Sequence, residues 1–191
     1  SGKSTVTAMV FAILKGAGRD PSVITGGDLP ELQAQGLPGN AWAGDADLLV
    51  VEADESDGSL VRYAPAIGVI LNLQRDHKEM AEVAAMFATL RARAREELVV
   101  GDNETLDPFA GGALRFGTSA RADLRGEDVE LGPASSRFRV WDTKFTLPVP
   151  GAHNVANALA AIAACRVLGV TLEEMVSPLA SFRGIGRRFQ T

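Results

Sequence analysis

The chain has 191 residues, of which 46% are hydrophobic and 23% charged, and its formal net charge is −5. These values are typical of one α/β domain with a full core, and they exclude a general nucleic-acid-binding or anionic-membrane surface. No apolar run reaches the ~20 residues of a membrane span. The single cysteine, Cys165, cannot form an internal disulfide, so a reducing compartment, the cytoplasm, is expected. We expect its side chain to be a buried small hydrophobe rather than a nucleophile.

The chain opens with Ser1-Gly2-Lys3-Ser4-Thr5, and helical periodicity follows from Lys3 to Lys15. These residues match the second half of a phosphate-binding loop, G-x-x-x-x-G-K-[ST], whose backbone N–H groups cradle phosphates while the lysine reaches the β/γ oxygens. The hydroxyl after that lysine binds Mg²⁺, and either Ser4 or Thr5 can supply it. The first glycine and its strand are missing, which predicts a fragment. Because G-K-[ST] is also common at ordinary helix starts, other residues must decide.

The first half of the chain alternates strand and helix patterns, which predicts a mostly parallel, doubly wound α/β sheet. Apolar runs that end in polar residues indicate its buried strands. The expected elements are a strand at 21–25, a long irregular connection at 26–44, strands at 47–53 and 66–73, a helix at 79–98 and a further strand that begins with residues 98–100.

The segment 115–150 has a different pattern, with short alternating stretches that favour a small antiparallel sheet at the edge of the main one. Helical patterns return at 151–169 and after Thr171, where Glu174 completes a capping-box pattern. We find no internal repeat or linker, and therefore predict one domain spanning 1–191.

Carboxylates gather where the strand at 47–53 ends: Glu52, Asp54, Glu55 and Asp57 lie within six residues. Such a cluster repels itself unless a cation compensates it, and a hard divalent cation bridging ATP phosphates is the natural partner. The alternative is a solvated loop in which Asp54 or Ser56 caps the next helix. Glu52 differs because it directly terminates an apolar strand.

His77 follows the next expected strand, at the edge of a parallel sheet where ligands collect, although it could also be a surface histidine. Asn154 and Asn157 are three residues apart and share one helical face. Their amides could read the edge of a base or simply cap the helix. Arg187 and Arg188 follow a flexible turn and suit phosphate binding, or form a basic surface loop.

Five segments, taken in chain order, resemble the central ATP-binding domain of the Mur ligase family, the ATP-dependent amide ligases of peptidoglycan synthesis. They are SGKST, EADESDGS, NLQRDH, PGAHNVANALAA and GIGRRF. The forms EADESD, HNVxNALAA and GRRF look most like the branch that adds L-alanine to UDP-N-acetylmuramate. The resemblance extends essentially from end to end of the chain. It implies ATP and Mg²⁺ as cofactors.

The resemblance also implies roles for individual residues. Lys3 would contact the β/γ phosphates within the Gly2–Thr5 loop, and Ser4 or Thr5 would bind Mg²⁺. The remaining implied roles are magnesium binding by Glu52 and His77, adenine contacts by Asn154 and Asn157, and neutralisation of the transferring phosphate by Arg188, with Arg187 as second choice.

In this family a substrate carboxylate is phosphorylated to an acyl phosphate, which an amino-acid amine then attacks. The protein's contribution is to position the reactants and neutralise charge. The resemblance implies that the UDP-sugar docks on a preceding domain and the amino acid on a following one. Both are absent from this chain, so the fragment alone is expected not to ligate. The sequence does not give its oligomeric state.

The chain departs from the alanine-adding pattern at Ser1, where histidine is typical, and at Lys78-Glu79, where the usual loop continues Met-Asp. The helix expected at 79–98 contains no lysine, which excludes the variant with a carbamylated lysine. A related Mur-like ligase with another carboxylate and amine therefore stays open, as does a non-catalytic nucleotide-binding domain. A P-loop kinase or GTPase would not explain the HNxxN helix followed by GRRF.

Overall fold

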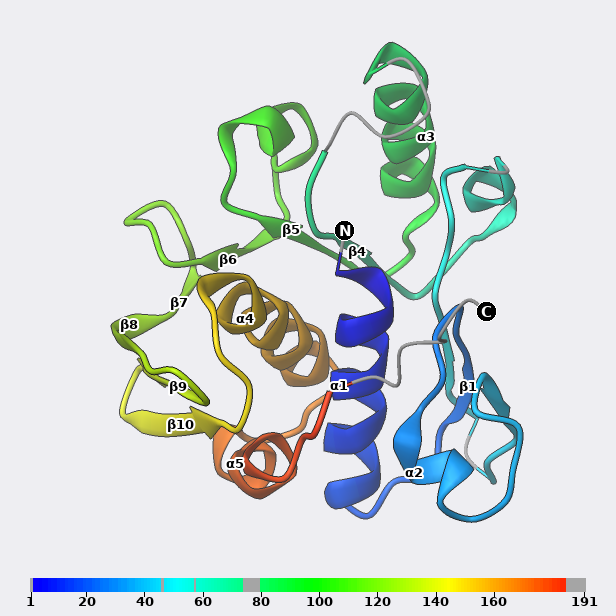
Figure 1. Ribbon diagram of the computed structural model, residues 1–191. Helices are drawn as coiled ribbons and strands as arrows, with labels where there is room; N and C mark the ends of the chain where they lie inside the picture. The colour runs from blue at the N-terminus through cyan, green and yellow to red at the C-terminus, as the bar shows by residue number, and fades with distance from the viewer. Residues whose placement is uncertain (1, 46, 57, 74–79, 185–191) are drawn as a thin grey trace.

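The computed structural model describes residues 2–45, 47–56, 58–73 and 80–184, and Figure 1 shows their arrangement around a central helix. Strands form three sheets. The first has the order β2-β1-β3, with β1 antiparallel to β2 and parallel to β3. The second, β4-β5-β6-β7, is parallel throughout, and the third, β10-β9-β8, is antiparallel. The mixed α/β fold with a parallel sheet and a small antiparallel one is as predicted.

The strand bounds are β1 Ser22–Ile24, β2 Ala41–Trp42, β3 Leu49–Val51, β4 Ile67–Ile70, β5 Glu97–Gly101, β6 Leu114–Gly117, β7 Leu124–Arg125, β8 Glu127–Leu131, β9 Ser136–Val140 and β10 Thr143–Leu147. The α-helices are α1 Lys3–Gly16, α2 Pro30–Gln33, α3 Met80–Arg93, α4 Ala152–Val167 and α5 Leu172–Ala180. Two 3₁₀ helices, η1 Ser59–Arg62 and η2 Glu104–Phe109, follow β3 and β5.

Helix α1 forms the centre of the molecule (Figure 1). Every residue from Val6 to Leu14 is buried, so the helix is covered all round, as an apolar run without a polar face requires. It packs against α4 and α5 and contacts β3. Gly18, with φ of 76°, follows its end in the left-handed region. Because α1 is packed on several sides, its position in the core also fixes the position of its first turn, which begins at Lys3.

Helix α4 lies between α1 and the parallel sheet, where it contacts β4, β5, β6 and β7. Small residues allow this close packing, since Ala158 to Cys165 are all buried. Cys165 is fully buried, as predicted, and burial raises the pKa of its thiol to about 12. Helix α5 begins with the expected capping box between Thr171 and Glu174.

Four sequence predictions differ from the structure in detail. The segment 26–44, which is rich in glycine and proline and was expected to be a long irregular connection, contains α2 and β2. Helix α3 ends at Arg93, before the predicted Leu98, because the chain turns into β5. Within 115–150, β6 and β7 join the parallel sheet, and only β8, β9 and β10 form the antiparallel one. Strand β3 is not fully buried, since Leu49 is 56% exposed.

Among the described helices, none is long and apolar enough to cross a membrane.

Candidate functional site

Glu52 is the centre of a hydrogen-bonded cluster at the ends of two parallel strands. The register pairs Ile24 with Val51, so the next residues, Thr25 and Glu52, lie side by side. One carboxylate oxygen of Glu52 accepts from Thr25 Oγ1 at 2.7 Å and from the N–H of Gly26 at 2.7 Å. The other oxygen accepts from Ser4 Oγ at 2.7 Å. The carboxylate is thus held in a defined orientation at the start of α1.

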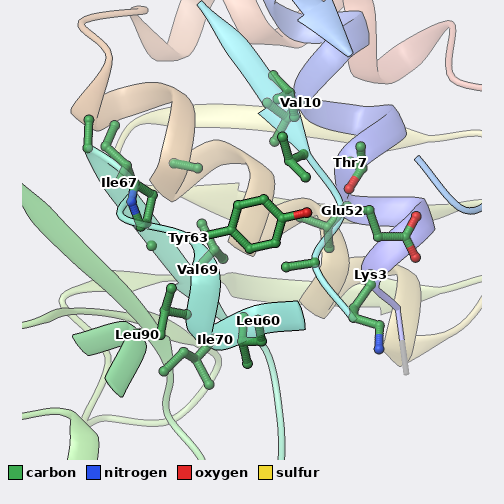
Figure 2. Close-up of a pocket in the computed structure, with 18 of the residues that line it drawn as sticks. Lys3, Thr7, Val10, Glu52, Leu60, Tyr63, Ile67, Val69, Ile70 and Leu90 are labelled. Atoms are coloured by element: carbon green, nitrogen blue, oxygen red, sulfur yellow. The ribbon is translucent and has the colours of Figure 1, made fainter. Parts of the chain in front are cut away.

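Lys3 lies in the same region and is paired with the acidic loop that follows β3. Its ammonium is 2.6 Å from Glu55 Oε2 and 3.4 Å from Asp54 Oδ1. Partial burial alone would lower the pKa of Lys3, but the hydrogen bond and charge of Glu55, together with Asp54, outweigh it and raise this pKa. Lys3 is therefore a cation at neutral pH. Figure 2 shows Lys3 and Glu52 on the same side of a cavity.

Asp54 shapes this loop instead of capping a helix. Its carboxylate accepts the N–H of Ser56 at 2.8 Å, and this backbone hydrogen bond, with others from Ser56 and Lys3, lowers the pKa of Asp54. The 3₁₀ helix η1 begins after Gly58, whose φ is 72°, with no side-chain cap. The prediction that Asp54 or Ser56 caps the next helix is therefore wrong, and the Asp54 carboxylate stays ionised beside Lys3.

The charges of the site suit a phosphate together with a divalent cation. The start of α1 and the Lys3 ammonium attract an anion. Glu52, Asp54 and Glu55 would repel that anion unless a cation lay between them. Oxygen donors from Glu52 and Ser4 are the type that Mg²⁺ prefers, and Mg²⁺ usually completes its shell with water and phosphate oxygens. The described residues contain no group of three or more His, Cys, Asp or Glu side chains that could hold a metal ion.

Gly2 and Asn157 bring α4 to the phosphate-loop end of α1. Gly2 has φ of 95°, and a Cβ added there would lie 2.5 Å from Asn157 Oδ1. Only glycine fits this conformation and this contact. Asn154, one turn earlier on α4, donates through Nδ2 to the carbonyl of Pro150 at 2.7 Å. Asn154 is not the N-cap of α4, since that residue is Gly151 and no side chain caps the helix, whereas Asn157 lies at the loop itself.

The structure brings several of the predicted site residues together, and others lie outside the described residues. Lys3, Ser4 and Glu52 form one cluster, and of the two candidate hydroxyls the described contact to Glu52 is made by Ser4. Thr5 lies in the first turn of α1. The predicted roles of His77, Arg187 and Arg188 lie outside the described residues.

Sequence reasoning missed Thr25 and Gly26. Thr25 is only 5% exposed and holds Glu52, and the N–H of Gly27 donates to its hydroxyl at 3.3 Å. A polar residue directly after the strand at 21–25 was the available signal, because it occupies the same sheet edge as Glu52. We infer that Thr25 positions the carboxylate.

The fold and the site define an α/β domain of the phosphate-loop type, with a Gly-Lys-Ser helix start beside a strand-end glutamate. Residues 1–165 match the Mur ligase middle domain, so the chain belongs to the Mur ligase family.

Several relatives are UDP-N-acetylmuramate–L-alanine ligases. That of Synechocystis is 32% identical over 99% of this chain and 39% of its own length, and that of Solibacter usitatus is 36% identical over 99% and 43%. A solved structure of the UDP-N-acetylmuramate–alanine ligase from Thermotoga maritima is 29% identical, with a TM-score of 0.85 over 99% of this chain and 44% of that one. This chain therefore spans about two fifths of the length of the relatives it matches.

Proposed function

We propose that this domain supplies the ATP and Mg²⁺ site of a ligase that joins L-alanine to the carboxylate of UDP-N-acetylmuramate. The named relatives support this choice of substrates, and they match over essentially the whole chain. The observation that carries the proposal is the cluster in which Ser4 of the phosphate-loop helix donates to Glu52 while Lys3 lies beside it. A metal-bound triphosphate needs these groups at this place.

The residues of the chain would act by holding and neutralising the nucleotide. Lys3 and the N–H groups at the start of α1 would bind phosphate oxygens, and Ser4 and Glu52 would hold Mg²⁺. When bound, Mg²⁺ neutralises charge on the β and γ phosphates. Lys3 would exchange its contact with Glu55 for one with phosphate, which is feasible because the pair is partly exposed. These groups favour transfer of the phosphoryl group to the sugar carboxylate, and the resulting acyl phosphate is then open to attack by an amine.

The substrate requirement of the intact protein tests this function. We expect phosphate release from ATP only when UDP-N-acetylmuramate and L-alanine are both supplied, because the acyl phosphate must form and then be consumed for turnover. The measurement is release of inorganic phosphate with each substrate omitted in turn and with glycine or serine in place of alanine. Phosphate release that ignores the sugar nucleotide would contradict the ligase assignment. Turnover with a different amine would assign the domain to a related amide ligase.

We propose that Asn157 contacts the nucleotide near its adenine end. In the intact ligase, Asn157→Ala should raise the KM for ATP about tenfold, consistent with loss of a hydrogen bond of ~1.4 kcal/mol, and leave the KM for the sugar substrate nearly unchanged. Steady-state kinetics with ATP and with GTP measures both effects.

The comparison of nucleotides distinguishes two roles for Asn157. If its amide reads adenine, Asn157→Ala should reduce the preference for ATP over GTP. If its contact with Gly2 instead supports the phosphate loop, the KM values for both nucleotides should rise by the same factor. Asn154→Ala is the matched control from the same helical face, because the Asn154 amide donates to the carbonyl of Pro150 and not to the phosphate loop. An unchanged KM for ATP in Asn157→Ala would contradict both roles.

A further inference from the structure

The ammonium group of Lys3 is held most closely by Glu55. Its distance to Glu55 Oε2 is 2.6 Å, against 3.4 Å to Asp54 Oδ1. The shorter distance is that of a strong, charge-assisted hydrogen bond. The Lys3 side chain is 32% exposed and that of Glu55 26%, so water screens this pair less than a fully exposed one. A phosphate oxygen that binds Lys3 must therefore displace the Glu55 carboxylate.

Glu55 and Asp54 are held differently, although they are neighbours in the chain. The Asp54 carboxylate accepts the N–H of Ser56 at 2.8 Å and is thus part of the turn after β3. Within the described part of the chain, the Glu55 carboxylate has one hydrogen-bond partner, Lys3. Glu55 contributes to the turn through its backbone instead, since its carbonyl accepts the N–H of Gly58 at 3.3 Å. The Glu55 side chain can therefore leave Lys3 while the turn stays intact.

The segment that follows this turn is fixed to the rest of the domain. Leu60, in η1, is buried, and its carbonyl accepts the N–H of Tyr63 at 3.3 Å. The guanidinium of Arg93, at the end of α3, donates to the carbonyl of Val61. Because these contacts hold the backbone on the far side of the turn, a displaced Glu55 carboxylate stays close to the phosphate site.

We propose that Glu55 competes with the nucleotide for Lys3, and that this competition makes the site select the Mg²⁺ complex of ATP over free ATP. The inference rests on the proposed function and concerns how the same site is regulated. Once Glu55 is displaced, the carboxylates of Glu52, Asp54 and Glu55 all lie near the incoming phosphates. A free triphosphate meets this charge with Lys3 as its counterion and is repelled. In the Mg²⁺ complex part of the phosphate charge is already compensated, so the exchange costs less.

Binding of a non-hydrolysable ATP analogue to the intact ligase tests this competition. The measurement is isothermal titration calorimetry with β,γ-imido-ATP, in EDTA and in excess Mg²⁺, for the wild type and for Glu55→Gln. The glutamine amide keeps the size of the side chain but lacks its charge. We expect Glu55→Gln to bind the metal-free analogue about five- to tenfold more tightly than the wild type, and the Mg²⁺ complex less than about twofold more tightly.

Glu127→Gln is the matched control, because it removes one negative charge from an ion pair in the antiparallel sheet. Glu127 lies 3.1 Å from Arg139, and its side chain is 36% exposed. This variant should bind both forms of the analogue as the wild type does. Equal tightening in the two variants would overturn the proposal, since net charge alone would then explain it. A wild type that binds the analogue in neither condition would contradict the proposed function. An unchanged ratio in Glu55→Gln, beside normal binding, would contradict only the role of Glu55.

The reactivity of Lys3 provides a second test. Partial burial lowers the pKa of Lys3, but the hydrogen bond and charge of Glu55 outweigh this effect and raise it. Without that carboxylate, more of the reactive neutral amine is present at mildly alkaline pH. In Glu55→Gln, acetylation of Lys3 by acetic anhydride should therefore be about two- to fivefold faster than in the wild type, while Lys15 reacts at the same rate in both. Mass spectrometry of the two lysine peptides measures this. Equal rates for Lys3 in the two proteins would overturn the proposal.

Discussion

In the intact ligase, Lys3→Met should lower kcat/KM for ATP by about 100- to 1,000-fold, the range typical for removal of one preorganised group that stabilises developing charge. Lys3 is the described cation at the start of α1, where the backbone N–H groups already favour an anion. The fold should survive the change, because partly exposed ion pairs such as that with Glu55 contribute little to stability. The measurement is phosphate release at varied ATP, together with thermal unfolding.

Lys15→Met is the matched control for that variant. Lys15 lies at the other end of the same helix and also forms an ion pair, with Asp20 at 2.8 Å, and its ammonium lies 5.9 Å from the centre of the Trp42 ring. It should retain full activity. Since the pKa of Lys3 is raised, its ammonium stays protonated as pH rises from neutral to mildly alkaline, and activity should show no loss from Lys3 there. Equal activity of the two variants would remove Lys3 from the phosphate site.

Local sequence patterns identified most elements of the fold, because hydrophobic periodicity and turn residues act over short distances. The helix after Lys3, the capping box at Thr171 and the strand pattern ending at Glu52 are examples. The pairing of strands with one another was harder to predict from the sequence. Whether 114–117 joins β5 or an antiparallel neighbour depends on residues distant in sequence, and β-propensity does not encode partners.

The candidate site was predictable where one residue type at a strand end suffices. Glu52 stood out because a carboxylate directly followed an apolar run, and its contact with Ser4 agrees with that interpretation. Thr25 did not stand out, because its role depends on β1 lying next to β3. Asn157 illustrates a different limit. Its spacing from Asn154 suggested a shared role, but their environments differ, since one lies against Gly2 and the other is bonded to Pro150.

Glu52→Gln should have the second large effect on turnover. This substitution removes the charge of the side chain and keeps its shape. The glutamine carbonyl can accept from Thr25 and from the Gly26 N–H, and its amide can donate to Ser4 Oγ, so all described contacts of Glu52 can be kept. The negative charge is lost. We expect turnover of the intact ligase to fall about 100-fold, with a higher Mg²⁺ concentration needed for half-maximal rate, because a neutral amide oxygen binds a hard cation more weakly than a carboxylate.

Two variants of Thr25 complete this test, because they alter the geometry and keep the charge. Thr25→Val removes the hydroxyl that donates to Glu52 and should reduce turnover about tenfold, in line with loss of a group that orients a metal ligand. Thr25→Ser restores a hydroxyl and should recover most of the rate. The readout is phosphate release titrated with Mg²⁺ for all three variants.

Glu52→Gln and the wild type could need the same Mg²⁺ concentration for half-maximal rate. In that case Glu52 only holds Ser4 and Thr25 in place through hydrogen bonds, and the metal lies elsewhere. If Thr25→Val loses activity and Glu52→Gln does not, the orientation of the Glu52 side chain matters more than its charge.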